Sequence, residues 1–339
     1  MHIRNNIKSL LPYSTAREEY KGGNISVWLD ANESPYNNGV NRYPDPHQKE
    51  LKQAIAQLKG VQPNQVFIGN GSDEAIDLCF RIFCEPGIDN VVAIAPTYGM
   101  YSVAAAINNI SVKEVPLKAN TYALDVEALL RAADEHTRLM WVCSPNNPTG
   151  NAFALSQLEQ LATRFDGVLV VDEAYIDFSD KGSMLSVLNQ HPNVVVLQTL
   201  SKAWGMAGLR LGLAFASPEV AAVFARVKYP YNVNGPTQRE VMHRLTTEAH
   251  DAHVVEVKHE REALAWQLMA APCVEHVYAS DANFVLVKVH DADALYAHLV
   301  AQGIIVRNRH RIAGCENCLR LTIGTPEENA RLLQAIVTF

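Results

Sequence analysis

The chain has 339 residues, of which 48% are hydrophobic, and its formal net charge is -7. This length predicts about two domains with a large core, and the acidic balance argues against a nucleic-acid-binding surface. No apolar run approaches the ~18 residues of a membrane-spanning helix, and the first residues lack the apolar core of a signal peptide, so we expect a cytoplasmic protein.

Hydrophobic, β-branched runs alternate with helical patterns through most of the chain, and this alternation predicts a mainly parallel sheet covered by helices on both faces. The predicted strands of this sheet lie at residues 91–95, 139–142, 168–171, 194–198 and 213–216.

The pattern changes after about Tyr229 and predicts a smaller α+β domain. Its expected elements are a long polar helix at 237–269, a strand at 283–289, a helix at 291–302, short strands at 304–306 and 319–323, and a final helix from Pro326. We therefore predict an N-terminal arm (1–33), a large α/β domain (34–229) and a small α+β domain (230–339).

The segment FIGNGSDEAIDLCF, residues 67–80, predicts a short strand, a glycine turn and then a helix that begins near Ser72. Free backbone N–H groups at the start of a helix, together with the helix dipole, form a cradle for a phosphate. A glycine pair before a helix is weak evidence alone, and the segment lacks the third spaced glycine of a dinucleotide-binding fingerprint.

The segment CSPNNPTG, residues 143–150, follows an apolar run and predicts a turn at the end of a strand. The side-chain amide of Asn147 can donate a hydrogen bond to an oxygen of a bound ring. Pro145 and Pro148 stiffen the turn, and either X–Pro bond is a candidate for the cis form.

The apolar run in VLVVDEAYIDF, residues 168–178, ends abruptly in Asp172 and Glu173. We interpret it as a buried parallel strand with acids at its carboxyl end, the edge where ligands of open α/β sheets gather. A carboxylate there can pair with the protonated ring nitrogen of a cofactor, and Asp172 is the candidate. Tyr175 is placed to reach a hydroxyl of the same ring. The alternatives are a helix N-cap for Asp172 and a packed aromatic for Tyr175.

The run TLSKAWGMAGLRLG, residues 199–212, places Lys202 directly after Ser201 and upstream of Arg210. A lysine forms a Schiff base with an aldehyde only when its amine is neutral, and burial beside another cation lowers its pKa towards that state. Serine and arginine are residue types that hold a phosphate. Because pyridoxal phosphate carries both an aldehyde and a phosphate, the run indicates a site for that cofactor. A solvated lysine in a loop is the alternative.

Together these four segments resemble the pyridoxal-phosphate aminotransferases of the aspartate aminotransferase fold type, fold type I, over nearly the whole chain. A narrower resemblance, to the histidinol-phosphate aminotransferases, rests on LDANESP at 29–35, NRYPDP at 41–46, APTYGMY at 95–101, and VRNR and LRLTIGT towards the end. The resemblance implies a large three-layer α/β domain, a smaller α+β C-terminal domain, and a homodimer with shared active sites.

The resemblance also implies a role for each candidate residue. Lys202 is implied to hold pyridoxal 5'-phosphate covalently and to move the α-proton, and Asp172 to pair with the ring nitrogen. Further cofactor contacts are implied for Ser72, Asp73, Tyr98, Asn147, Tyr175, Ser201, Arg210 and, from the second subunit, Tyr43. Substrate contacts are implied for Tyr13, Tyr43, Asn147, Arg307 and Arg320. No metal is implied, and the N-terminal residues are implied to pack on the small domain and the partner subunit.

Two arginines near the C-terminus indicate which kind of substrate the site binds. Arg307 ends one predicted strand and Arg320 begins another, so adjacent strands bring two cationic groups to one mouth, where a dianionic group fits. A surface salt bridge is the alternative for each. Arg309 and Arg311, in the same loop, are expected to be solvated.

Six cysteines in so long a chain do not predict a disulfide framework. Cys315 and Cys318 form a C-x-x-C without a second pair, and we interpret them as incidental thiols in a loop rather than a zinc or redox site.

The predicted reaction is transamination between histidinol phosphate and 2-oxoglutarate, which gives imidazole-acetol phosphate and glutamate in histidine biosynthesis. A threonine-phosphate decarboxylase stays open because it uses the same cofactor frame and a phosphorylated substrate. Aromatic amino acids stay open as substrates, since a pocket for an imidazole admits other rings. A regulator that has lost catalysis is a further alternative, against which the presence of Lys202, Asp172, Tyr175 and Arg210 argues.

Overall fold

The computed structural model describes residues 2–15, 25–247 and 249–339, and its centre is a seven-stranded sheet with the order β1-β7-β6-β5-β4-β2-β3. β7 runs antiparallel to β1 and β6, whereas the other neighbouring strands pair in parallel, which confirms the predicted mainly parallel sheet. The strands are β1 (Val66–Asn70), β2 (Asn90–Ala95), β3 (Ser111–Pro116), β4 (Thr137–Cys143), β5 (Val168–Asp172), β6 (Val194–Thr199) and β7 (Leu211–Phe215).

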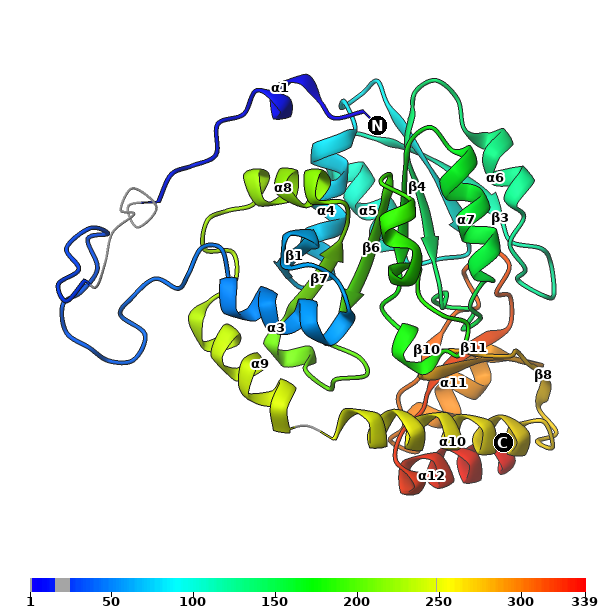
Figure 1. Ribbon diagram of the computed structural model, residues 1–339. Helices are drawn as coiled ribbons and strands as arrows, with labels where there is room; N and C mark the ends of the chain where they lie inside the picture. Colours follow the sequence, from blue (N-terminus) through cyan, green and yellow to red (C-terminus); the bar gives the residue numbers. More distant parts are fainter. Residues whose placement is uncertain (1, 16–24, 248) are drawn as a thin grey trace.

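Helices cover both faces of this sheet, as Figure 1 shows, and give the predicted three layers. Side chains along β5 alternate between two hydrophobic clusters, because successive residues of a strand point to opposite faces. Leu169 and Val171 join one cluster and Val170 the other. The first cluster includes α3 (Lys49–Lys59), α6 (Val126–Ala132) and α7 (Leu155–Arg164), and the second includes α4 (Ser72–Phe83), α5 (Met100–Ile107) and α8 (Pro218–Val227). Short 3-10 turns are η1 (Pro63–Gln65), η2 (Ile176–Phe178), η3 (Met184–Gln190) and η4 (Ala207–Leu209).

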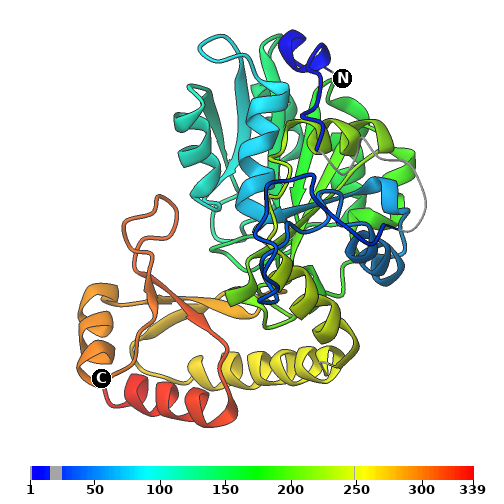
Figure 2. The ribbon, with the colours of Figure 1, turned by 90° about the vertical axis from the view of Figure 1, so that its left-hand side faces the viewer.

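A four-stranded antiparallel sheet with the order β10-β11-β9-β8 forms the smaller α+β part. Figure 2 shows this sheet between the large domain and helices α10 and α12. Val285 and Val287 pack in the cluster of these helices, whereas Leu286 joins the main cluster of the large domain. The elements are α10 (His250–Leu268), β8 (Val274–Val277), β9 (Phe284–Val289), α11 (Ala292–Ala301), β10 (Arg307–Asn308), β11 (Cys318–Thr322) and α12 (Pro326–Val337).

The single helix expected at 237–269 is wrong, because the structure has two helices in this region. α9 (Gly235–Thr247) packs on α3 and η4, and its Val241 belongs to the core of the large sheet. α10 packs on the smaller sheet instead, and the two helices point in different directions in Figure 1. By these contacts α9 lies with the large sheet; the predicted domain boundaries stay a prediction.

Among the N-terminal residues that the structure describes, a short helix packs on the large domain and not on the small domain, contrary to expectation. Within α1 (Asn5–Lys8), Ile7 joins the cluster of α4 and α8. Arg4 N donates to Ile82 O at 3.0 Å, and Arg226 Nη1 donates to Lys8 O at 3.2 Å. These contacts attach α1 to the large domain.

The short strand expected at 304–306 lies slightly later in the chain, at β10, where the chain pairs with β11. Val306 packs in the hydrophobic cluster between the smaller sheet and its helices. No helix within the described ranges is long and apolar enough to cross a membrane.

Candidate active site

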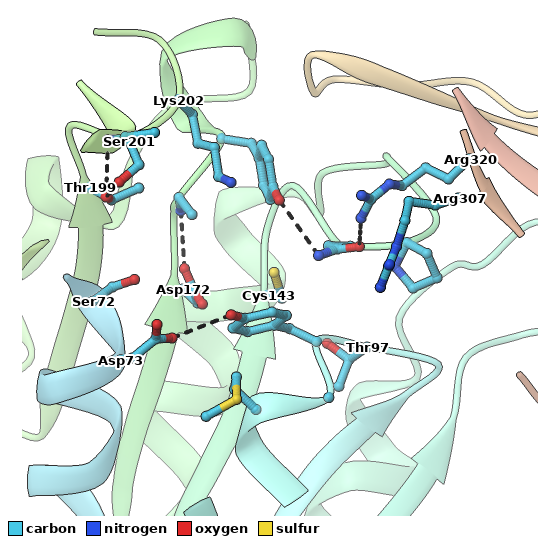
Figure 3. A pocket seen from close by; sticks show the side chains of 18 of the residues that line it. Ser72, Asp73, Thr97, Cys143, Asp172, Thr199, Ser201, Lys202, Arg307 and Arg320 are labelled. Atoms are coloured by element: carbon cyan, nitrogen blue, oxygen red, sulfur yellow. Dashed lines mark hydrogen bonds between the residues drawn. The ribbon is translucent and has the colours of Figure 1, made fainter. Parts of the chain in front are cut away.

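The topology of the large sheet brings distant parts of the chain to one edge. β4, β5 and β6 are parallel, so their carboxyl ends meet there, and the antiparallel β7 starts at the same edge. A cavity of about 620 Å³ lies at this edge, beneath the smaller sheet (Figure 3). It is lined by every candidate residue except Tyr13 and Tyr43, namely Ser72, Asp73, Tyr98, Asn147, Asp172, Tyr175, Ser201, Lys202, Arg210, Arg307 and Arg320.

One end of the cavity is the N-terminus of α4. Gly71 precedes this helix with φ +78°, and its N–H donates to Arg210 O at 2.8 Å. Ser72, Ser201 and Arg210 line the cavity here. Free helical N–H groups, hydroxyls and a guanidinium are together the donor set that binds a phosphate.

Close contact between β7 and α4 shapes this cradle. A Cβ atom on Gly212 would lie 2.0 Å from Ser72 N, so the helix start sits against a strand residue that lacks a side chain. A Cβ on Gly71 would likewise lie 2.6 Å from Arg210 Nη2. Gly212 is therefore required for the approach of β7 to the helix, whereas Gly71 is favoured by its positive φ.

Gly212→Ala is expected to displace the start of α4, weaken cofactor binding, and lower the free energy of unfolding by about 1–3 kcal/mol through overpacking. Gly208→Ala is the matched control, because nothing lies within 4 Å of the added methyl group. Cofactor titration and urea unfolding measure the two effects. Equal cofactor affinity in both variants would show that the tight approach at Gly212 does not shape the cradle.

Asp172 ends β5 and is 3% exposed. Its Oδ2 accepts a hydrogen bond from Tyr101 Oη at 2.7 Å, and its Oδ1 accepts one from Ala174 N at 3.1 Å. Burial raises the pKa of the Asp172 carboxyl, and these two donors oppose that rise. The side chain is thus a fixed, buried carboxylate that faces the cavity.

Tyr101 is a site residue that sequence reasoning missed. It is 1% exposed and stacks on Trp141 with ring centroids 4.8 Å apart. Its position in APTYGMY, three residues after Tyr98, was the only sequence signal.

Glu173 faces away from the cavity, as the alternation of a strand requires. Its carboxylate accepts hydrogen bonds from Met184 N at 2.7 Å and from Gln198 Nε2 at 2.9 Å. Burial raises the pKa of Glu173 to about 7. These contacts give Glu173 a structural role in anchoring η3.

Lys202 follows β6 in a loop, and Figure 3 shows its amine directed into the cavity. Its Nζ lies 5.6 Å from the centroid of the Tyr175 ring. Loss of hydration, and then the positive charge of Arg320, lower the pKa of the Lys202 amine. The side chain nevertheless stays accessible to solvent through the cavity. A lowered pKa favours the neutral amine that reacts with an aldehyde.

Asn147 connects the turn after β4 to both sides of the cavity. Its Nδ2 donates to Tyr175 Oη at 3.5 Å, and its Oδ1 accepts from Arg320 Nη1 at 2.5 Å. Burial raises the pKa of Tyr175 above its usual range, so its hydroxyl stays protonated and able to donate. The bonds before Pro145 and Pro148 are both cis, which confirms that prediction.

Tyr98 lies on the side of the cavity formed by α4 and the loop after β2. Its hydroxyl donates to Asp73 Oδ1 at 3.3 Å, and Asp73 Oδ2 is 3.6 Å from Arg210 Nη2. Burial, with Asp73, raises the pKa of Tyr98 to about 12.

The smaller sheet supplies an arginine-rich wall opposite the lysine loop. Arg307 of β10 and Arg320 of β11 are direct partners in the ladder. Leu319 and Leu321 pack in the cluster of the helices, so Arg320 between them points towards the large domain. Arg309 also lines the cavity, and the expectation that it is solvated is wrong. Arg311 is exposed, as expected.

Of the two C-x-x-C cysteines, Cys315 lies in a loop as predicted, whereas Cys318 lies in a strand. Cys315 and Cys318 are 0% and 1% exposed, and Cys318 begins β11. Tyr122 Oη lies 3.9 Å from Cys315 Sγ and donates to Gly314 O at 2.6 Å. Burial raises the pKa of both thiols, and the described residues contain no cluster suited to a metal ion.

Tyr13 and Tyr43 lie outside this cavity within the single chain. Tyr43 is 49% exposed and stacks on Tyr231 with ring centroids 4.4 Å apart. Tyr13 is 73% exposed and borders a separate hollow beside α8.

The residues of the cavity fit the cofactor that the resemblance implies. A phosphate cradle lies at α4, a buried carboxylate held by two donors lies at the end of β5, and a lysine with a lowered pKa is directed towards the space between them. Tyrosine and amide donors line the remaining wall.

Comparisons with known proteins agree with this geometry. The family model for aminotransferase class I and II matches residues 16–336. The histidinol-phosphate aminotransferase of Parabacteroides distasonis is 53% identical over 335 residues, which cover 98% of this chain and 96% of that protein. The protein of the same name from Bacteroides thetaiotaomicron is 52% identical over 338 residues, with 98% and 96% covered.

A solved structure extends the similarity to three dimensions. The histidinol-phosphate aminotransferase from Sinorhizobium meliloti, in complex with pyridoxal-5'-phosphate, matches with a TM-score of 0.81 and 25% identity. The match covers 88% of this chain and 82% of that one. The chain belongs to the class I and II aminotransferase family.

Proposed function

We propose that the protein is a pyridoxal-phosphate-dependent histidinol-phosphate aminotransferase that transfers an amino group between histidinol phosphate and 2-oxoglutarate in histidine biosynthesis. The observation that carries this proposal is one cavity with two anion-binding ends. The cradle at α4 suits the phosphate of the cofactor, and the arginines of the smaller sheet suit a second, substrate anion. Relatives of this name are 53% and 52% identical over nearly the whole chain.

Pyridoxal phosphate, when bound, supplies an electron sink that stabilises a carbanion at the substrate carbon. Asp172 keeps the ring nitrogen protonated, because a buried carboxylate favours a positive partner. Lys202 would hold the cofactor, and its neutral amine would accept and return the α-proton of the substrate. Asn147 and Tyr175 donate to the ring oxygen. The phosphate would be held by Ser72, Ser201 and Arg210. Asp73 would orient Arg210, and Tyr98 would stack on the ring.

Arg307 and Arg320 are the substrate-binding arginines in this proposal. Arg320 is anchored by Asn147 and lies over the Phe284 ring, 5.0 Å from its centroid. It is placed to bind the α-carboxylate of glutamate as well as the phosphate of histidinol phosphate. Arg307 lies at the exposed mouth, where a phosphate arrives first.

Arg307→Ala is expected to lower kcat/KM for histidinol phosphate by about tenfold or more, because charge-assisted hydrogen bonds contribute about 1.5–3 kcal/mol. The effect on the unphosphorylated donor histidinol is expected to be smaller. Steady-state kinetics with both donors test this difference. Equal losses would mean that Arg307 does not bind the phosphate.

A homodimer with shared active sites accounts for Tyr13 and Tyr43. The segment 25–42 projects from the body of the chain in Figure 1 and carries exposed apolar side chains. These are Val27, Trp28, Leu29, Tyr36 and Val40. A projecting apolar segment suits burial against a second copy, which would carry Tyr43 to the partner's cavity. The cytoplasmic location predicted from the sequence stays a prediction.

Hybrid dimers test the shared site. Mixing Tyr43→Phe and Lys202→Ala subunits is expected to raise activity above that of either parent, since one site of each hybrid regains both residues. Differently tagged subunits show whether exchange has occurred. Absence of recovery after proven exchange argues that Tyr43 acts within its own chain or not at all.

A panel of amino donors tests the proposed reaction. The cofactor-loaded protein is offered histidinol phosphate, histidinol, threonine phosphate and aromatic amino acids with 2-oxoglutarate, and glutamate and carbon dioxide are measured. We expect glutamate from histidinol phosphate and no carbon dioxide from threonine phosphate. Carbon dioxide release would favour the decarboxylase, which the names of the similar relatives do not favour.

A further inference from the structure

The Arg309 side chain points into the cavity because the chain stays extended and bonded to β11 for one residue beyond the end of β10. Arg309 N donates to Cys318 O at 2.9 Å, so its main chain is held against β11. Asn308, one residue earlier, points to the opposite face, where its Nδ2 donates to Asp293 on α11 at 2.6 Å. Alternation along an extended chain therefore places Arg307 and Arg309 on the same, cavity-facing side.

Arg307, Arg309 and Arg320 form an arginine cluster that no acidic side chain of the described residues pairs with. None of the three forms an ion pair within the described residues. The acids that line the cavity, Asp73 and Asp172, are on its far side and have other partners.

Arg309 has hydrogen-bonding capacity that the protein leaves unused. Its buried Nε has no partner in the part of the chain that the structure describes. Burial, and then Arg320 and Arg307, lower the pKa of Arg309 to about 10. Holding an unpaired cation beside two others is unfavourable, and an anion bound between them offsets that cost.

Arg320 does not by itself meet the needs of a phosphate. Its Nη1 donates to Asn147 Oδ1, and its buried Nε has no partner among residues 2–15, 25–247 and 249–339. A phosphate dianion presents three acceptor oxygens, which are best met by more than one guanidinium fork.

From this geometry we infer that Arg309 is a specificity-determining residue that binds the phosphate of the substrate together with Arg307. The inference rests on the proposed function and extends it to a residue outside the set predicted from the sequence. It also gives a function to the third arginine of this wall. A substrate carboxylate alone would not require three arginines. The expected consequence is discrimination between phosphorylated and unphosphorylated donors.

The test compares Arg309→Gln with Arg311→Gln in the cofactor-loaded enzyme. Arg311 lies two residues further in the same loop, is exposed and does not line the cavity, so it is a matched control for loss of one positive charge. Arg309→Gln is expected to lower kcat/KM for histidinol phosphate by about tenfold or more and to change that for histidinol by less than about twofold. Arg311→Gln is expected to leave both values nearly unchanged. Arg309→Lys keeps the positive charge but loses the bidentate guanidinium, so a smaller loss of kcat/KM for histidinol phosphate is expected. This variant replaces Arg309→Gln if Arg309→Gln does not fold.

Binding of inorganic phosphate to the cofactor-loaded enzyme, measured by calorimetry, gives a readout independent of turnover. We expect weaker binding in Arg309→Gln than in Arg311→Gln. Equal binding and equal donor preference in the two variants would overturn the role of Arg309. Failure of the wild-type protein to use histidinol phosphate would instead refute the proposed function, and phosphate binding alone would then decide whether Arg309 binds anions.

Discussion

Lys202→Ala is expected to reduce transamination by about 10⁴-fold or more, because it removes both the attachment point of the cofactor and the group that moves the α-proton. The phosphate cradle and Asp172 are untouched, so the variant is expected to fold and to retain cofactor non-covalently. Turnover with histidinol phosphate and cofactor absorbance measure these two properties. Lys118→Ala, at an exposed position remote in the sequence from the cavity segments, is the control and is expected to be fully active. Near-normal turnover of Lys202→Ala would assign proton transfer to another group.

Asp172→Asn is expected to slow proton abstraction by about 10²–10³-fold, a loss of ~3–4 kcal/mol of electrostatic stabilisation in the transition state. The amide has nearly the shape of the carboxylate and can still accept from Ala174 N, so folding is expected to persist. Single-turnover kinetics isolate the proton-transfer step.

Glu173→Gln is the control for this substitution, because Glu173 is an adjacent buried acid that faces away from the cavity. It is expected to change stability and to leave proton abstraction nearly unchanged. Equal rates for the two variants would contradict the pairing of Asp172 with the ring nitrogen.

Interior strands were predictable from the sequence, whereas two edge strands, β3 and β8, were not. β5 and β6 each begin with four apolar residues and are buried on both faces, which produces continuous hydrophobic runs. β3 and β8 lie at sheet edges and leave most of their side chains at least partly exposed, so their sequences lack such a run. The break between α9 and α10 is set by packing on different sheets, which helical periodicity does not report.

Site residues were predictable from the sequence where they lie at or just after the carboxyl end of a strand. Asp172 comes directly after an apolar run, Asn147 and Lys202 follow such runs within about five residues, and parallel topology brings these ends together. The roles assigned to the site residues stay predictions until they are tested.

Contacts between distant segments explain what the sequence could not reveal. Tyr101 and Asp172 are separated by 71 positions, and the direction of the Arg309 side chain depends on its ladder bond to Cys318. Tyr13 and Tyr43 lie outside the cavity of their own chain, so the contacts predicted for them stay predictions.

The central claim is that the cavity at the end of the large sheet binds pyridoxal phosphate through Lys202. Borohydride reduction of the cofactor-loaded protein, followed by proteolysis and peptide mass analysis, tests it most directly. The account predicts a single pyridoxyl-modified peptide that contains Lys202. A pyridoxyl group on any other lysine, with Lys202 unmodified, would contradict it.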